Sequence, residues 1–187
     1  MIKDFDLLQR ANNDYTTIDL EHAEELAYRE LIDSIRYISL GDECGVMGNI
    51  ANIITYKGRF YIQEEQFDRV FIYDDTGRCL KKIDNKGRGP GEYLRIESID
   101  INTEKEELML VDGMSDKLFF YDLDGNFKSI HSIRYFQTEN TLCLRDSVFL
   151  HISAPSQNFG NEGLYGYALV LSKGNENFLK GYRYLPL

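Results

Sequence analysis

The chain has 187 residues with 31 acidic and 21 basic side chains, which give a formal net charge of -10 at pH 7. This charge repels phosphate backbones and therefore argues against a nucleic-acid partner. No apolar stretch approaches the roughly 18 residues that a membrane helix needs, so no transmembrane segment is predicted. The aromatic residues, 13% of the chain, are all Tyr or Phe, which suit the half-buried surface of a β-sheet.

Residues 1–40 are predicted to form a leader ahead of the main domain, which we place at residues 41–187. Within the leader, YTTIDL at residues 15–20 has the pattern of a short strand. HAEELAYRELIDSI at residues 22–35 has an acidic start and apolar residues at helical spacing, so it predicts a short helix. RYISL at residues 36–40 predicts a return to strand. The opening residues contain no apolar core of a signal peptide.

An internal repeat runs through the first part of the main domain. A shift of 48 positions aligns the segment from Phe60 to Leu80 with the segment from Leu108 to Lys128 without a gap. The matched positions include Glu64 with Asp112, Asp68 with Asp116, Tyr73 with Tyr121, and Gly77 with Gly125. A fixed period of this length is typical of solenoids and propellers.

Each repeat predicts four short strands separated by turns. In the first repeat they are ANIITY, RFYIQE, RVFIYD and CLKKID, at residues 51–56, 59–64, 69–74 and 79–84. Val70 and Ile72 alternate with Phe71 and Tyr73, so large apolar groups point to both faces of one strand. Such a pattern is typical of a sheet that stacks on neighbours on both sides.

A third, weaker repeat follows. Its predicted strands are TLCL at 141–144, SVFLHIS at 147–153, YALVLS at 167–172 and LKGYRYL at 179–185, with residues 154–166 as an inserted glycine-rich loop. The predicted fold class is therefore all-β: a partial β-propeller of about three four-stranded antiparallel blades, preceded by a short N-terminal helix.

Several segments resemble the NHL-like six-bladed β-propeller proteins of gut bacteria, many of which are exported lipoproteins of unassigned function. The similarity lies in TIDL at Thr17–Leu20, ELIDSIRYISL at Glu30–Leu40, GNIANI at Gly48–Ile53, VFIYDDTGRCL at Val70–Leu80 and, most specifically, KGRGPGEY at Lys86–Tyr93. The resemblance implies a propeller whose ring is closed by a leader strand, a location in the periplasm or at the outer membrane, and no established reaction.

Six blades with a 48-residue period would need about twice the residues that follow the leader, so about half a ring is accounted for. A half ring would expose apolar blade faces to water, which is unfavourable for a monomer. We therefore expect either a fragment of a longer protein or a homo-oligomer. In the second case two copies, in isologous or head-to-tail contact, cover these faces.

The glycines of KGRGPGEY raise the question of a phosphate-binding loop, because glycines let backbone N–H groups approach an anion. The spacing matches neither G-x-G-x-x-G before a helix nor a G-K-S/T ending. A tight crossover between two blades fits better, with Pro90 stiffening it. Such crossovers lie on the face where propellers often bind ligands, so Arg88, Glu92 and Tyr93 are the predicted ligand contacts.

Two hairpin turns carry acidic residues. DLDGN at Asp122–Asn126 begins like a calcium loop, but Gly125 comes too early and Ile133 stands where a glutamate is needed. The equivalent DDTG at Asp74–Gly77 supports a turn in both places, with the glycines at positive φ.

No pattern predicts a catalytic residue, a metal site or a cofactor. The three histidines, His22, His131 and His151, are not at metal-ligand spacing, and no G-x-S-x-G serine motif occurs. The three cysteines, Cys44, Cys79 and Cys143, show no disulfide framework or C-x-x-C pair, so they are interpreted as small apolar core residues.

Two functions remain. The favoured one is a non-catalytic binding or scaffolding module at the cell envelope, acting on an unknown carbohydrate, peptide or protein ligand. The alternative is a hydrolase or lyase that uses carboxylates and a divalent metal in the central channel, because Glu64 and Asp112 occupy equivalent repeat positions. Plain repeat architecture also produces equivalent acids, which favours the binding module.

Overall fold

A computed structural model of the protein describes residues 32–133, 140–152, 167–174 and 177–183. These residues form twelve β-strands and one short 3-10 turn at Arg145–Ser147, and no helix among them is long and apolar enough to cross a membrane. The strand expected at residues 15–20, nearly all of the helix expected at 22–35 and the whole inserted loop at 154–166 lie outside the described residues.

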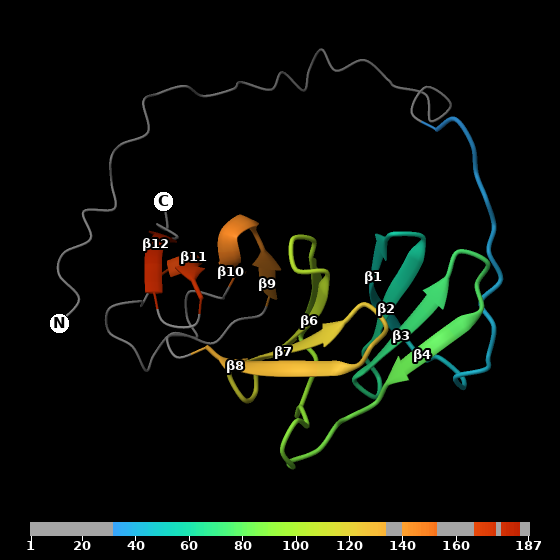
Figure 1. Ribbon diagram of the computed structural model, residues 1–187, viewed down its shortest axis with the longest axis horizontal. Coiled ribbons are helices and arrows are strands. Elements are labelled where there is room, and N and C mark those ends of the chain that lie inside the picture. The colour runs from blue at the N-terminus through green and yellow to red at the C-terminus, as the bar shows by residue number, and fades with distance from the viewer. Residues whose placement is uncertain (1–31, 134–139, 153–166, 175–176, 184–187) are drawn as a thin grey trace.

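The strands form three four-stranded antiparallel sheets, in each of which the strands follow one another in chain order (Figure 1). The first sheet contains β1 (Ile50–Tyr56), β2 (Arg59–Glu64), β3 (Arg69–Asp74) and β4 (Cys79–Ile83). The second contains β5 (Ser98–Asn102), β6 (Glu107–Asp112), β7 (Lys117–Asp122) and β8 (Phe127–Ser132). The third contains β9 (Asn140–Cys143), β10 (Val148–Ile152), β11 (Tyr167–Lys173) and β12 (Asn177–Arg183).

The sheets lie side by side in an arc, with β4, β8 and β12 on its outer side (Figure 1). The first strands of neighbouring sheets contact one another, β1 with β5 and β5 with β9. This radial arrangement of four-stranded meanders is that of β-propeller blades, and it confirms the predicted fold class.

The internal repeat corresponds to the same blade built twice. β6 begins 48 residues after β2, and β7 begins 48 residues after β3. The strand pairing repeats as well, since Arg59 faces Asp74 in the first sheet and Glu107 faces Asp122 in the second. The period read from the sequence is therefore the spacing of two structural units.

The first two sheets stack through alternating apolar side chains. Val70 and Ile72 of β3 share a buried cluster with Leu110 of the second sheet. Phe71 and Tyr73, which alternate with them, are buried on the opposite face. Each large apolar side chain that is fully buried contributes about 1.5–3 kcal/mol relative to an exposed one. The prediction that the apolar side chains of β3 are buried on both faces of the sheet is confirmed.

The second and third sheets meet through a separate cluster. Met109 belongs to it, and the ring centroids of Phe120 and Phe149 lie 6.4 Å apart across the interface. Cys143 lies here as a free thiol, with its backbone N–H donating to the Asp100 carboxylate at 2.6 Å and its Sγ 3.5 Å from Met109 Sδ. The interpretation of Cys143 as a small packing residue agrees with this position.

Residues 36–47 run along the face of the first sheet that is turned away from the second sheet. There Cys44 and Met47 pack against the cluster that contains Phe71 and Tyr73. The strand predicted at residues 36–40 is not formed. This segment runs beside the β3–β4 turn and pairs with no strand of a sheet. Its path is tied to that turn by the N–H of Gly41, which donates to the Gly77 carbonyl at 2.8 Å.

Gly77 is required at this contact for two reasons. Its φ is +89°, a conformation that side chains rarely adopt, and a Cβ atom there would lie 2.1 Å from the carbonyl oxygen of Ser39. The glycine of DDTG therefore serves both the hairpin turn and the approach of the preceding segment.

A disulfide joins Cys44 to Cys79, with the two Cα atoms 5.9 Å apart. The interpretation of these two cysteines as ordinary core residues is therefore wrong. They are separated by 35 residues, and only the passage of residues 36–47 across the first sheet brings them together. Neither the spacing of the cysteines nor the composition of the chain predicts such a disulfide.

The face of the third sheet that is turned away from the second sheet is apolar and is not covered by any described residue. Cross-strand pairs place Leu150 beside Leu142 and Leu171, and Leu169 beside Tyr182. Leu142 and Tyr182 are 36% and 45% exposed. Within the described part of the chain, this end of the arc therefore presents an apolar surface.

Hydrogen-bonded polar side chains cross the face of the third sheet that packs against the second sheet. The two ring nitrogens of His151 lie 2.9 Å from Thr141 Oγ1 and 2.8 Å from Ser172 Oγ, so one imidazole links β9, β10 and β11. All three side chains are buried. Burial lowers the pKa of His151 to about 4, because the charged imidazolium loses its hydration.

Removing the disulfide should destabilise the fold. The double variant Cys44→Ala/Cys79→Ala is expected to lose about 2–4 kcal/mol of unfolding free energy, because the link restricts the unfolded chain. Urea denaturation measures the difference. A reductant should bring the wild type to the level of the variant and leave the variant unchanged, and equal stability of both proteins without reductant would contradict the pairing.

Acid should weaken the third sheet through His151. The folded-state pKa lies below the ordinary value of 6.5, so the unfolded chain binds the proton first. Stability is then present above pH 6.5 and is lost as the pH falls towards 4, by about 3 kcal/mol. Denaturation of wild type and His151→Gln between pH 7 and pH 4 tests this, since the variant should lack that part of the pH dependence. Parallel pH profiles would refute it.

Candidate functional site

The segment between β4 and β5, residues 84–97, contains KGRGPGEY and crosses from the first sheet to the second; we call it the crossover loop. Its Lys86 ammonium pairs with the carboxylate of Asp68 in the β2–β3 turn. The other oxygen of Asp68 accepts the Ile96 N–H at 3.1 Å. One buried carboxylate therefore fixes both ends of the loop.

Tyr93 is fully buried beneath the crossover loop. Its hydroxyl donates to the Asp68 carbonyl at 2.9 Å and accepts the Asn85 N–H at 3.1 Å, while its ring meets Phe119 edge-on at 5.9 Å. Burial raises the pKa of Tyr93 well above its ordinary value, so the hydroxyl keeps the proton that it donates. Tyr93 thus supports the loop from below.

Glu92 bonds to the backbone of the crossover loop on its exposed side. Its carboxylate accepts the Gly89 N–H at 2.7 Å. A Cβ atom at Gly87 would lie 1.9 Å from the same carboxylate, so the glycine makes room for it. Glu92 occupies the place that an anion would take in a phosphate loop, which agrees with the interpretation of KGRGPGEY as a tight crossover.

Arg88 lies at the exposed tip of the loop and makes no ion pair or hydrogen bond with any residue that the structure describes. Two exposed apolar side chains come from the adjoining turns, Phe67 at 52% exposure and Met114 at 65%. The Arg69 guanidinium lies 4.6 Å above the Phe67 ring. We call the surface of Phe67, Arg88, Glu92 and Met114 the crossover face.

Glu64 and Asp112, the acids of the metal-dependent alternative, both cap local structure. The Glu64 carboxylate accepts the Arg69 Nε–H at 2.9 Å and the Gln66 N–H at 3.0 Å. Asp112 accepts the Leu94 N–H at 2.7 Å, which attaches the crossover loop to the β6–β7 turn. Among the described residues, no three His, Cys, Asp or Glu side chains come together as a metal site. The geometry matches the architectural interpretation of these acids.

The acidic turn DLDGN is a hairpin turn, as predicted. Asp122 Oδ1 accepts the N–H groups of Asp124 at 3.0 Å and Asn126 at 2.8 Å, and Oδ2 accepts the Asn126 amide at 2.9 Å. Gly125 has a φ of +79°. Both oxygens of Asp122 therefore hold the turn.

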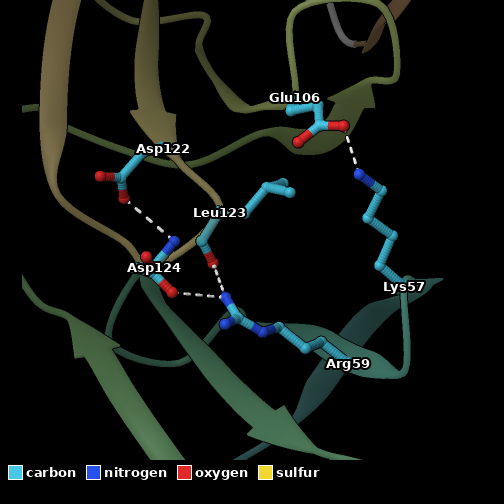
Figure 2. Close-up of a pocket in the computed structure, with 6 residues that line it drawn as sticks. All are labelled: Lys57, Arg59, Glu106, Asp122, Leu123 and Asp124. Carbon is cyan, nitrogen blue, oxygen red and sulfur yellow. Dashed lines mark hydrogen bonds and ion pairs between the residues drawn. The ribbon is translucent and has the colours of Figure 1, made fainter.

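A hollow of about 440 Å³ lies at the other end of the sheets, where the β1–β2 turn meets the β5–β6 and β7–β8 turns (Figure 2). It is lined by Lys57, Arg59, Glu106, Asp122, Leu123 and Asp124. Lys57 pairs with Glu106, and Arg59 pairs with Asp124 at 2.7 Å.

Sequence reasoning interprets these residues only as parts of turns, because the paired residues are 49 and 65 positions apart. No local pattern connects residues at such separations. The one signal that points to the site is the repeat itself, since stacked blades bring their equivalent turns to the same end.

Two solved structures share the fold. A protein of Bacteroides fragilis NCTC 9343, described as a putative exported protein, has a TM-score of 0.68 and 19% identity, over 80% of this chain and 43% of that chain. The structure of U3-55K has a TM-score of 0.51 and 11% identity, over 72% of this chain and 39% of that chain. The chain thus spans less than half the length of either, and the likeness concerns the fold alone.

None of the curated proteins matches this chain at a significant level. A family described as a domain of unknown function, DUF4934, matches residues 15–183 and so covers most of the length. This chain therefore belongs to the DUF4934 family.

Proposed function

We propose that this chain is an exported, non-catalytic binding or scaffolding module whose crossover face contacts a carbohydrate, a peptide or a protein. The observation that carries the proposal is Arg88, an exposed cation without a partner among the described residues. It stands on a loop that Asp68 and Tyr93 hold from the interior. A binding group on a preorganised loop loses little conformational entropy when it meets a ligand.

The rest of the crossover face has the composition of a contact surface. Exposed aromatic, methionine and arginine side chains are enriched where proteins bind partners, and here they are Phe67, Met114 and Arg88. Glu92 uses Oε2 in the loop and leaves Oε1 open to a ligand. Tyr93 acts in this proposal through the loop that it positions.

Two observations support export. The Cys44–Cys79 disulfide is of a kind that persists in oxidising compartments, such as the bacterial periplasm, and is rare in the cytosol. The fold is shared with a Bacteroides protein described as exported. Residence in the periplasm or at the outer membrane, with a lipoprotein anchor as in the NHL-like proteins, completes this part of the proposal.

The same proposal includes a six-bladed, NHL-like ring made by two copies in head-to-tail contact. Three blades form half of such a ring, and the open face of the third sheet offers Leu150 and Leu169 to a neighbour. On the first sheet Ile53, which pairs with the buried Ile62, is 50% exposed on the face turned away from the second sheet. Residues 36–47 cover the part of this face that contains Phe71 and Tyr73, so a second copy would contact the part around Ile53.

Binding at the crossover face is tested with glycan and peptide arrays. Wild type should retain a ligand class that Arg88→Ala binds at least tenfold more weakly, because a charged contact at the centre of a site contributes over 1.4 kcal/mol. Arg78→Ala, a change of an exposed arginine at the opposite end of the sheets, is the matched control and should bind like wild type. A stoichiometric divalent metal in the purified protein, or equal binding by all three proteins, would count against the proposal.

The ring is tested by light scattering of the full chain. Wild type should have twice the chain mass of 21.7 kDa. Leu169→Glu on the third sheet and Ile53→Glu on the first should each give the mass of one chain. Isologous pairing of two third sheets would leave Ile53→Glu dimeric, and a wild type of one chain mass would rule out the pairing of copies.

A further inference from the structure

The hollow between the first two blades has features of a binding site that the crossover face does not include. It lies at the opposite end of the sheets, and its volume of about 440 Å³ falls within the range of small-molecule sites, about 300–1,000 Å³. Each of its two ion pairs joins a cation of the first sheet to an acid of the second. Figure 2 shows the two pairs on opposite sides of the space.

The walls are held in position by bonds that do not involve a ligand. The Leu123 carbonyl accepts Arg59 Nη1–H at 2.8 Å and the Tyr61 hydroxyl at 3.1 Å. Asp122 holds the turn that carries Asp124. The site therefore needs little rearrangement before it binds.

The backbone of Lys57 and of Glu106 has a positive φ angle. Their φ angles are 49° and 53°, in the left-handed region that residues other than glycine rarely adopt. They occupy the tips of the β1–β2 and β5–β6 turns and pair with each other across the two blades. Lys57 is followed by Gly58 with a φ of 70°, the pair of positive angles that a type I′ hairpin turn requires, so the turn itself fixes where the Lys57 side chain leaves the backbone.

The paired charges of the lining disfavour charged ligands. A third acid of the lining, Asp122, uses both of its oxygens to hold its own turn. Both cations already have an acidic partner, so an anionic ligand would have to displace Glu106 or Asp124. A cationic ligand would similarly have to displace Lys57 or Arg59. A neutral ligand can bridge donors and acceptors without breaking either pair, and thus avoids the cost of separating charges.

Hydrogen-bonding capacity remains on both partners of each pair. Lys57 Nζ has three N–H groups and uses one on Glu106. Arg59 directs Nη1 to Leu123 and Asp124, which leaves Nη2–H groups. Each carboxylate has a second oxygen. Adjacent donors and acceptors match hydroxyl groups, which both donate and accept, and Leu123 adds an apolar contact for C–H groups.

We propose that this hollow is a binding site for a neutral saccharide, with the Lys57–Glu106 and Arg59–Asp124 pairs as its two hydrogen-bonding walls. A sugar ring placed between the pairs accepts from the cations and donates to the acids through neighbouring hydroxyls. The ligand thereby joins two blades. This site is separate from the crossover face and stands whether or not that face binds a ligand.

The test is a titration of the ¹⁵N-labelled full chain by NMR. The probes are D-glucose, D-galactose, D-mannose and N-acetyl-D-glucosamine, with D-glucuronate and glycine as charged comparators. At least one neutral sugar should give saturable shifts of the amide signals of Lys57, Gly58, Glu106 and Asp124, and the charged probes should bind more weakly. No saturation by any neutral sugar at 100 mM, or tighter binding of a charged probe, would overturn the assignment.

Variants locate the binding. Lys57→Met and Asp124→Ala should each raise the dissociation constant at least tenfold. Lys128→Met changes a lysine that pairs with Glu107 outside the hollow, and it should leave the constant within a factor of two. The spectra themselves report whether each variant is folded, and unchanged affinity in folded Lys57→Met and Asp124→Ala would place the sugar elsewhere and refute the proposal.

Discussion

The structure depends on one constraint: each sheet carries large apolar groups on both faces, so each face needs a cover. Val70 and Phe71, adjacent in one strand, are both fully buried because they face different neighbours. The second sheet covers one face, and residues 36–47 cover part of the other. A blade of this composition alone would expose its apolar surface to water, so the fold is stable only as a stack.

Ion pairs join the stacked parts at both ends of the sheets. Asp68 ties the crossover loop to the first sheet, and the Lys57–Glu106 pair joins two blades at the other end. The stack thus has a rigid centre, and its variable chemistry lies in turns at its two ends. Both candidate surfaces are accordingly built from residues in turns or at the ends of strands, which the stacked sheets hold in place.

The sequence predicts the elements that repeat and misses the contacts that occur once. The 48-residue period gives the strands of the first two sheets, and the acidic turns follow from their glycines. The Cys44–Cys79 link is not predictable, because it depends on the path of a segment without regular structure. Arg88 is placed on an exposed loop by its motif, whereas the burial of Tyr93 and the Arg59–Asp124 pair depend on how two blades stack.

The free thiol at the interface of the second and third sheets bears on the proposed export of the protein. An unpaired cysteine in a protein that has a disulfide is a risk, because its thiolate can attack the disulfide bond and exchange the pairing. Burial, with Asp100 close by, raises the pKa of Cys143 to about 12, so almost none of it is thiolate at neutral pH. Packing therefore keeps Cys143 unreactive, so in the oxidising compartment that we propose for this chain the thiol would not exchange with the Cys44–Cys79 disulfide.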